Sequence, residues 1–129
     1  LDGILVQQMA KAGTEIILGV KNDRQLGPML LVGLGGVFVE IFKDTTLIPC
    51  PISLSEAREH LKKLTSYRLL TGYRGSRPCD VDALAELMVK VSDYAVANKN
   101  TLKEMDINPV YVYEAGQGVC VVDALIVKE

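Results

Sequence analysis

The sequence has few of the residues that build metal clusters and nucleophilic active sites. Among its 129 residues there are three cysteines and one histidine. The cysteines are odd in number, lie far apart and include no CxxC pair, which argues against a disulfide framework and a cysteine-rich zinc site. They indicate a reducing compartment, so we expect a cytoplasmic protein. Catalysis through a Ser–His–Asp or Cys–His group would need His60, which falls in a charged helical stretch typical of solvated side chains.

The sequence also lacks an excess of positive charge and a long apolar run. Fourteen basic residues against 16 acidic ones give a net charge of −2, and no basic cluster is interleaved with aromatics. We therefore expect no nucleic-acid partner. No apolar run reaches the roughly 18 residues of a membrane span, and no signal peptide opens the chain, so we expect no membrane partner. A content of 49% hydrophobic and 23% charged residues is typical of one globular folding unit.

Short apolar runs rich in β-branched residues dominate the first third of the chain. They predict four strands, the first two antiparallel around a turn at Gly13: 4–9, 15–20, 29–34 and 37–42. The polar segment 22–28 ends in Gly-Pro and predicts a turn. The glycine run 33–36 precedes a strand instead of a helix, so it is no dinucleotide-binding loop, and a bulge or tight turn is the simple interpretation.

Two helices are predicted next. Ser53 and Glu56 form a capping-box pattern directly after Pro51. Apolar residues then recur at helical spacing, at Leu54, Ala57, Leu61 and Leu64. Asp80 is a suitable cap for a longer helix from Val81 to about Ala97. The core stripe expected for this second helix is Leu84, Leu87, Met88, Val91, Tyr94 and Ala95.

The chain ends in a pattern typical of a β-hairpin. Segments 105–113 and 119–127 are strand-like and flank a Gly116-Gln117-Gly118 turn. Segment 65–79, between the helices, contains glycine, proline and arginine and predicts a structured loop. Strands first, two helices later and a final hairpin together predict an α+β fold with a mainly antiparallel sheet.

The hairpin carries the residues that best suit a metal ion. Asp106 and Asn108 are two apart on one strand and would present two oxygen donors on one face, with Asp123 on the opposite strand. Hard cations such as Mg²⁺ prefer such oxygen ligands. Asp123 falls among apolar residues, where a carboxylate is costly to desolvate unless it is paired or metal-bound. The alternative is that Asp106 and Asn108 cap turns before Pro109, and the pattern alone does not separate the two.

Glu15 is a weaker candidate. It opens an apolar strand after a turn of small residues, where a solvated carboxylate at the end of a strand is the more common case.

Five segments, spread from about residue 3 to residue 127, resemble the C-terminal half of an ATP-grasp domain. The resemblance is closest to ADP-forming acyl-CoA synthetases and the β subunit of succinyl-CoA synthetase. The D-x-N-P segment followed by Val-Asp-Ala is the most specific part. In order along the chain, the segments are ILVQQMAKAGTEIILGVKNDRQLGP, VGLGGVFVEIFKD, YRGSRP, MDINPVYV and VVDALIV.

The resemblance implies a role for particular residues. The main chain of the hinge Gln8, Met9, Ala10 and Lys11 would contact the adenine edge of ATP or ADP. Glu15 would accept hydrogen bonds from the ribose. The three oxygen-bearing side chains of the hairpin would hold Mg²⁺ against the β- and γ-phosphates, and they are Asp106, Asn108 and Asp123. Gly35 and Gly36 would allow a tight turn beside the nucleotide site.

The resemblance also implies that residues 1–129 are one ATP-grasp subdomain of a larger acetate–CoA ligase, a fragment that by itself we expect to have little or no turnover. The phosphate-covering loop, the CoA-binding segment and the phosphohistidine segment do not occur in it. Its partners would be the remaining synthetase domains or subunits. Two rivals are a synthetase-like regulatory region of a lysine acetyltransferase and a subunit-interaction module that has lost nucleotide. Departures from the pattern are an Asp where Glu is frequent, at Asp106, and no Arg or Lys in 47–51.

Overall fold

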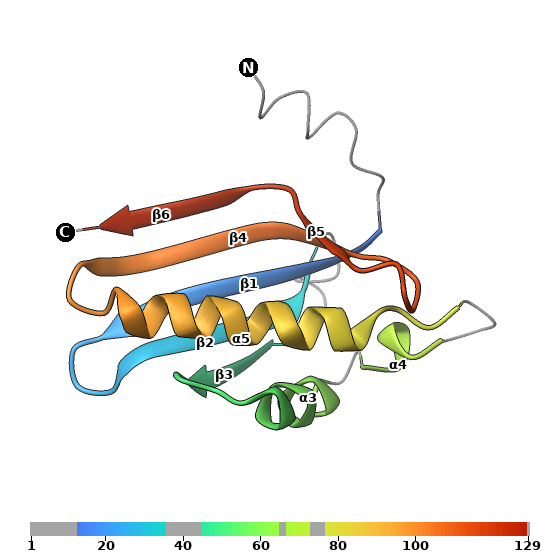
Figure 1. Ribbon diagram of the computed structural model, residues 1–129, viewed down its shortest axis with the longest axis horizontal. Coiled ribbons are helices and arrows are strands. Elements are labelled where there is room, and N and C mark those ends of the chain that lie inside the picture. The colour runs from blue at the N-terminus through green and yellow to red at the C-terminus, as the bar shows by residue number, and fades with distance from the viewer. Residues whose placement is uncertain (1–12, 36–44, 65–66, 73–76, 129) are drawn as a thin grey trace, which may run out of the picture.

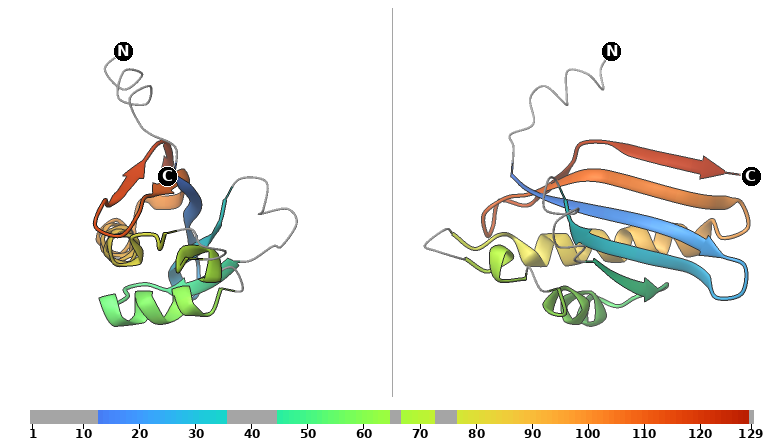
Figure 2. Two further views of the ribbon diagram at one scale, coloured as in Figure 1. Left: turned by 90° about the vertical axis from the view of Figure 1, so that its right-hand side faces the viewer. Right: turned by 180° about the vertical axis from the view of Figure 1, so that it is seen from behind.

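A six-stranded antiparallel sheet with two main helices on one face forms the protein (Figures 1 and 2). The computed structural model describes residues 13–35, 45–64, 67–72 and 77–128. The strands run in the order β3-β2-β1-β4-β5, with β6 also paired to β4. The strands are β1 (Thr14–Asp23), β2 (Gly27–Leu34), β3 (Thr45–Pro49), β4 (Leu102–Val112), β5 (Val119–Val121) and β6 (Ala124–Lys128). The helices are α3 (Leu54–Lys62), α4 (Tyr67–Leu70) and α5 (Val81–Ala97). The predicted α+β class is confirmed.

The ends of both main helices follow from their capping residues. The Ser53 hydroxyl accepts from the backbone N–H of Glu56, and the Glu56 carboxylate accepts from the Ser53 N–H, so the predicted capping box is present. Asp80 caps α5 by accepting from the Ala83 N–H at 3.1 Å. The predicted start of each helix is therefore confirmed.

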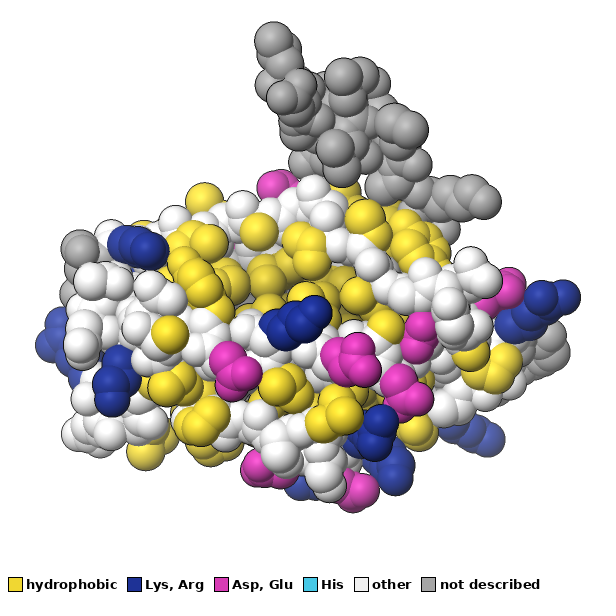
Figure 3. Space-filling view, viewed as in Figure 1, with side chains coloured by type: hydrophobic (Ala, Val, Ile, Leu, Met, Phe, Trp, Pro, Cys, Tyr) yellow, Lys and Arg dark blue, Asp and Glu magenta, His cyan; other side chains and the backbone are white. Residues whose placement is uncertain are grey.

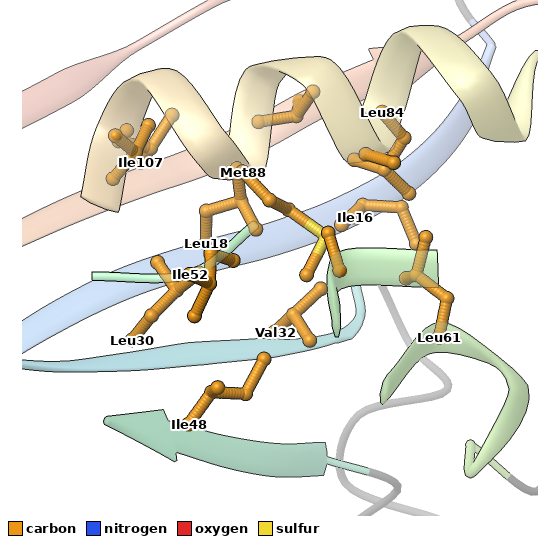
Figure 4. Packing of buried hydrophobic residues seen from close by; sticks show 14 of the residues in the cluster. Ile16, Leu18, Leu30, Val32, Ile48, Ile52, Leu61, Leu84, Met88 and Ile107 are labelled. Atoms are coloured by element: carbon orange, nitrogen blue, oxygen red, sulfur yellow. The ribbon is translucent and has the colours of Figure 1, made fainter. Parts of the chain in front are cut away.

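The core lies between the helices and one face of the sheet (Figure 4). Alternate residues of β1 point into it, so that Ile16 and Leu18 are fully buried. The buried stripe of α5 consists of Leu84, Ala85, Met88, Val91, Ser92 and Ala95. Leu87 and Tyr94, which the sequence predicted in this stripe, are half-buried at its margin.

The buried stripe of α5 includes one polar residue, Ser92, which forms a hydrogen bond in the core. Ser92 is fully buried, and its Oγ accepts from the backbone N–H of Ile52 at 3.0 Å. The segment from Cys50 to Ile52 joins β3 to α3, so this bond fixes it against the middle of α5. Burial raises the pKa of the Cys50 thiol above its ordinary value of 9.0, and the hydrogen bond to Ser92 opposes that rise.

The pairing of β1 differs from the prediction. Segment 15–20 was expected to pair with 4–9, which lies outside the described residues, as does the predicted strand 37–42. The structure instead pairs β1 with β2 on one side and with β4 on the other. The hairpin turn between β1 and β2 confirms the predicted turn at 22–28. Asp23 shapes it by accepting from the N–H groups of Gln25 and Leu26, and these bonds hold the pKa of Asp23 below its ordinary value of 3.8.

Two further elements were not predicted. The strand β3 occupies part of the expected connection before α3, and the expected loop 65–79 contains the single turn α4. The terminal hairpin is confirmed, but its second strand is interrupted between β5 and β6 at Val122 and Asp123.

Candidate functional site

The face of the sheet opposite the helices carries those predicted site residues that the structure describes. No described helix lies on this face, which we call the helix-free face (Figure 2). Because side chains alternate along a strand, Ile16, Leu18 and Val20 enter the core, and the residues between them point the other way. The residues of β1 on the helix-free face are Glu15, Ile17, Gly19 and Lys21.

The strand β4 adds two oxygen donors to this face. Asp106 and Asn108 are exposed, and Ile107 between them is 5% exposed on the core side. The two side chains therefore lie on one face, as the sequence predicted. Both lie within β4 and not in a turn, so the alternative that they cap turns is wrong. Neither side chain forms a hydrogen bond with the described part of the chain, which leaves their oxygens available to a ligand.

Asp123 requires a correction. The sequence suggested a carboxylate buried among apolar neighbours, whereas Asp123 is exposed in the break between β5 and β6. The desolvation argument is wrong because this segment lies at the edge of the sheet, where Leu125 is also 62% exposed. One carboxylate oxygen accepts from the Ala124 N–H at 2.9 Å. The backbone still lies beside the other donors, since the Asn108 N–H donates to the Asp123 carbonyl at 3.2 Å.

Glu15 is half-buried and lies opposite Tyr111 of β4. Its carbonyl accepts from the N–H of Gly35 at 2.8 Å, directly after β2 ends. A Cβ on Gly35 would lie 3.2 Å from the backbone of Glu15, so any other residue would require this backbone to shift by a few tenths of an ångström. Gly35 therefore lies directly beside Glu15, whereas the tight turn expected at Gly35 and Gly36 stays a prediction, because Gly36 lies outside the described residues.

The strand register orders these residues along β1. Glu15 lies opposite Tyr111, and Gly19 lies opposite Asp106. Between these two rows the pairing of β1 with β4 shifts between Ile16 and Leu18, at the level of Asn108. Rows two residues apart on a strand are separated by about 7 Å. Successive rows of one face, which we call levels, therefore hold Glu15, the Asn108–Asp123 pair and Asp106.

The donor set suits a cation that shares its coordination with a ligand. Within the described ranges, no three side chains of His, Cys, Asp or Glu gather closely enough to hold a metal ion by themselves. The site has two carboxylates and an amide oxygen, which is too few for a closed cage. Mg²⁺ is typically bound in this way, by one or two protein carboxylates with phosphates and waters. The residues present therefore fit Mg²⁺ together with a polyphosphate.

The remaining predicted site residues cannot be placed. Gln8, Met9, Ala10 and Lys11 all lie outside the described residues, and their contact with a base stays a prediction.

Sequence reasoning missed the second role of Asp80. Besides capping α5, its other carboxylate oxygen accepts from the N–H groups of Gly116 at 3.1 Å and Gly118 at 2.8 Å, in the turn that leads to β5. The turn was predicted from its glycines, but its partner lies 36 residues away along the chain. A cavity of about 260 Å³ lies beside this junction, and none of the predicted site residues lines it.

Comparison with known proteins decides which family has this arrangement. Residues 1–127 match the sequence profile of the ATP-grasp domain. The chain belongs to the ATP-grasp family. The resemblance stated from the sequence is therefore confirmed.

Relatives of this ATP-grasp chain include ligases that form ADP. It is 44% identical over 125 residues to the β subunit of acetate–CoA ligase (ADP-forming) II from Pyrococcus furiosus. That match covers 97% of this chain and 53% of the relative. It is 44% identical over 119 residues to acetate–CoA ligase (ADP-forming) I from Archaeoglobus fulgidus, covering 92% of this chain and 17% of the relative. The ATP-grasp chain thus spans about half the length of the first relative and less of the second. Neither relative favours the acetyltransferase-linked or interaction-module alternative.

Solved structures share the fold closely. The crystal structure of PH1788 from Pyrococcus horikoshii superposes with a TM-score of 0.89 at 41% identity, over 94% of this chain and 51% of that one. An acetyl-coenzyme A synthetase 1 from Ca. Korarchaeum cryptofilum, in complex with coenzyme A and Mg-AMPPCP, has a TM-score of 0.85 at 40% identity. That match covers 93% of this chain and 55% of the synthetase chain. The sheet and helices described above are therefore those of an ATP-grasp fold.

Among the residues that the structure describes, no helix is both long and apolar enough to cross a membrane. The expected cytoplasmic location stays a prediction.

Proposed function

We propose that this chain is the nucleotide- and Mg²⁺-binding half of the ATP-grasp domain of an ADP-forming acyl-CoA synthetase. The parent reaction is acyl-CoA + ADP + phosphate ⇌ carboxylic acid + CoA + ATP, through an acyl phosphate and a phosphohistidine. This half supplies one wall of the nucleotide site. The other wall and the groups that carry the acyl and phosphoryl intermediates belong to the remaining synthetase domains or subunits.

One observation carries the proposal. The helix-free face collects Glu15 from β1 and Asp106 and Asn108 from β4 on successive levels, beside Asp123 from the last hairpin. Ninety or more residues separate Glu15 from the other three along the chain, and the sheet brings them to one face. These residues do not build the core, which lies on the opposite face. The exposed Asp106 carboxylate and Asn108 amide, which form no hydrogen bond with the described part of the chain, are suited to a ligand.

Each residue has a defined task in this proposal. Glu15 accepts hydrogen bonds from the ribose hydroxyls, and the main chain of residues 8–11 binds the adenine edge. Asp106, Asn108 and Asp123 would hold Mg²⁺, and the ion would neutralise charge on the phosphates during transfer. Because this transfer depends on positioning and charge neutralisation, this half needs no covalent catalyst, and His60 of α3 has no role in it.

The test is a titration of Mg–AMPPCP into the full-length synthetase that carries this chain, followed by calorimetry. Replacing a metal ligand should weaken binding more than the loss of a supporting residue, which costs about 10- to 100-fold in metal affinity. We therefore expect Asp123→Ala and Asn108→Ala each to weaken Mg–AMPPCP at least about tenfold. Removing Mg²⁺ with a chelator should abolish the difference between these variants and the parent.

Glu104 offers a matched control. It is an exposed carboxylate on the same strand, opposite Lys21 and one level beyond Asp106. Glu104→Ala should change the affinity for Mg–AMPPCP less than twofold, roughly the effect of an exposed charge. Absence of binding by the parent protein, or equal binding by Asp123→Ala and the parent, would show that this face is not the nucleotide site.

A further inference from the structure

Gly19 occupies an unusual place for a glycine. It lies in the middle of β1, paired on both sides, opposite Leu31 of β2 and Asp106 of β4. Glycine in the interior of a strand weakens the strand, because it loses more conformational freedom on folding and offers no side chain for packing. A glycine at this position therefore needs a reason.

The described part of the chain supplies no such reason. The φ angle of Gly19 lies outside the left-handed region that favours glycine. A Cβ built on Gly19 would lie 3.5 Å from the carbonyl oxygen of Met105 and 3.8 Å from Cβ of Leu31, which are ordinary van der Waals distances. Gly35 is different, since a Cβ there would lie only 3.2 Å from the backbone of Glu15. A Cβ at position 19 is thus compatible with the described part of the chain around it.

Gly19 contributes no side chain to the helix-free face. Across the sheet, the row at this level reads Leu47, Leu31, Gly19, Asp106 and Leu125 from β3 to β6. Gly19 is the member of this row that contributes no side chain, and it lies directly beside Asp106. Glycine in a strand is frequently found where a ligand approaches the backbone closely.

We propose that the absence of a side chain at Gly19 leaves room on the helix-free face, beside Asp106, for the terminal-phosphate and Mg²⁺ end of the bound nucleotide. The inference rests on the proposed function and adds a residue that determines which part of the ligand fits. The order of levels along β1 selects the phosphate end over the base. Glu15, assigned to the ribose, lies two levels away, and the Asn108–Asp123 pair lies between them. Gly19 is therefore a positioning residue that acts through the space it leaves.

The test compares two ligands on two variants, Gly19→Ala and Gly19→Val, in the full-length synthetase. Mg–AMPPCP carries the triphosphate-like end and the ion, whereas AMP carries the base and ribose with one phosphate. Filling a packed space by one or more carbons is unfavourable, so we expect Gly19→Ala to weaken Mg–AMPPCP about tenfold and Gly19→Val to weaken it further. AMP binding should stay within about twofold. The melting temperature of both variants should equal or exceed that of the parent, since Ala and Val are better strand residues than Gly.

Lys21→Arg is the control, because it adds volume two residues further along the same face at an exposed position. It should leave the affinity for both ligands unchanged. Three results would overturn the inference: unchanged Mg–AMPPCP affinity in both glycine variants, an equal loss for AMP, or weaker binding accompanied by a lower melting temperature. Failure of the parent protein to bind Mg–AMPPCP is a separate result that would overturn the proposed function and this inference together.

Discussion

Asp80 shows how one carboxylate can organise two distant parts of the chain. One oxygen accepts from Ala83 and so begins α5, while the other accepts from Gly116 and Gly118 in the β4–β5 turn. Its backbone N–H also donates to the Tyr113 carbonyl at 2.7 Å. These bonds fix the hairpin that carries Asn108 and Asp123 relative to the long helix. Asp80 therefore supports the site without being a ligand.

Replacing Asp80 with Ala should lower the free energy of unfolding by about 2–3 kcal/mol, from the lost helix cap and two lost charge-assisted hydrogen bonds. Amide hydrogen exchange at Gly116 and Gly118 should become faster. Asp82→Ala is the matched control, since Asp82 is 72% exposed and pairs with the exposed Arg58 at 3.1 Å. That pair should contribute less than about 1 kcal/mol. Equal losses of stability in the two variants, measured by urea unfolding, would contradict this account.

At the scale of elements, α5 does more than cover the sheet. Through Ser92 it binds the connection between β3 and α3, at a point where both Ser92 and the Ile52 backbone are buried. A buried N–H without a partner costs free energy, so this hydroxyl is required for the connection to lie where it does. The position of the connection between β3 and α3 against α5 thus depends on one polar group within an apolar stripe.

Ser92→Ala should lower the free energy of unfolding by about 1–3 kcal/mol, because the Ile52 N–H loses its acceptor in the core. It should also raise the pKa of Cys50 further, since the Ser92 hydrogen bond opposes the effect of burial. The thiol should then react more slowly with iodoacetamide at pH 8.5, because only the thiolate reacts. Cys120 in the same protein is the internal control and should keep its rate. An unchanged rate at Cys50 would argue against the Ser92 contact.

The sign of the pH dependence follows from the same shift. The pKa of Cys50 is raised in the folded protein, so folding favours the neutral thiol. Its contribution to stability is present below the ordinary value of 9.0 and is lost as the pH rises through the higher folded value.

The parts of the fold that could be predicted from the sequence are those set by neighbours along the chain. Helix caps at Ser53 and Asp80, the apolar period of α5 and the glycine turn at 116–118 all act over a few residues. The pairing of β1 with β4 could not be predicted, because β4 follows it by about 80 residues and no local pattern encodes that pairing.

The candidate site shows the same division. The shared face of Asp106 and Asn108 follows from the two-residue period of a strand and was predicted. The exposure of Asp123 depends on β5 and β6 lying at the edge of the sheet, which is a property of the assembled fold. Gly19 gave no signal in the sequence, since its meaning depends on the atoms that surround it.

At the scale of the whole molecule, the helices leave the β5–β6 edge uncovered. Val121 is 43% exposed and Ile126 is 45% exposed on this edge. Figure 3 shows hydrophobic surface between α5 and the last strands on the helix side. Within the described residues β6 pairs only with β4, so its other edge offers unpaired backbone groups. An apolar strand with a free edge favours association with another chain.

Residues 1–129 by themselves should consequently self-associate through β6. Ile126→Lys places a charge on the edge and should raise the concentration needed for association at least about tenfold. Leu26→Lys is the control, because Leu26 is 70% exposed in the β1–β2 turn, in a different part of the chain. Sedimentation velocity distinguishes the two: an equal response of both variants would show that association does not use β6.

The alternation of side chains along β1 has a consequence for which substitutions this protein can accept during evolution. Residues 16, 18 and 20 face the core, and residues 15, 17, 19 and 21 face the opposite side. Selection for folding therefore acts on the core-facing positions. Under the proposed function, selection on ligand contacts acts on the positions between them. In a saturation library of β1, substitutions at the even positions should lower the abundance of the protein in cells more than substitutions at the odd positions. The odd positions are then free to adjust what is bound without loss of the fold.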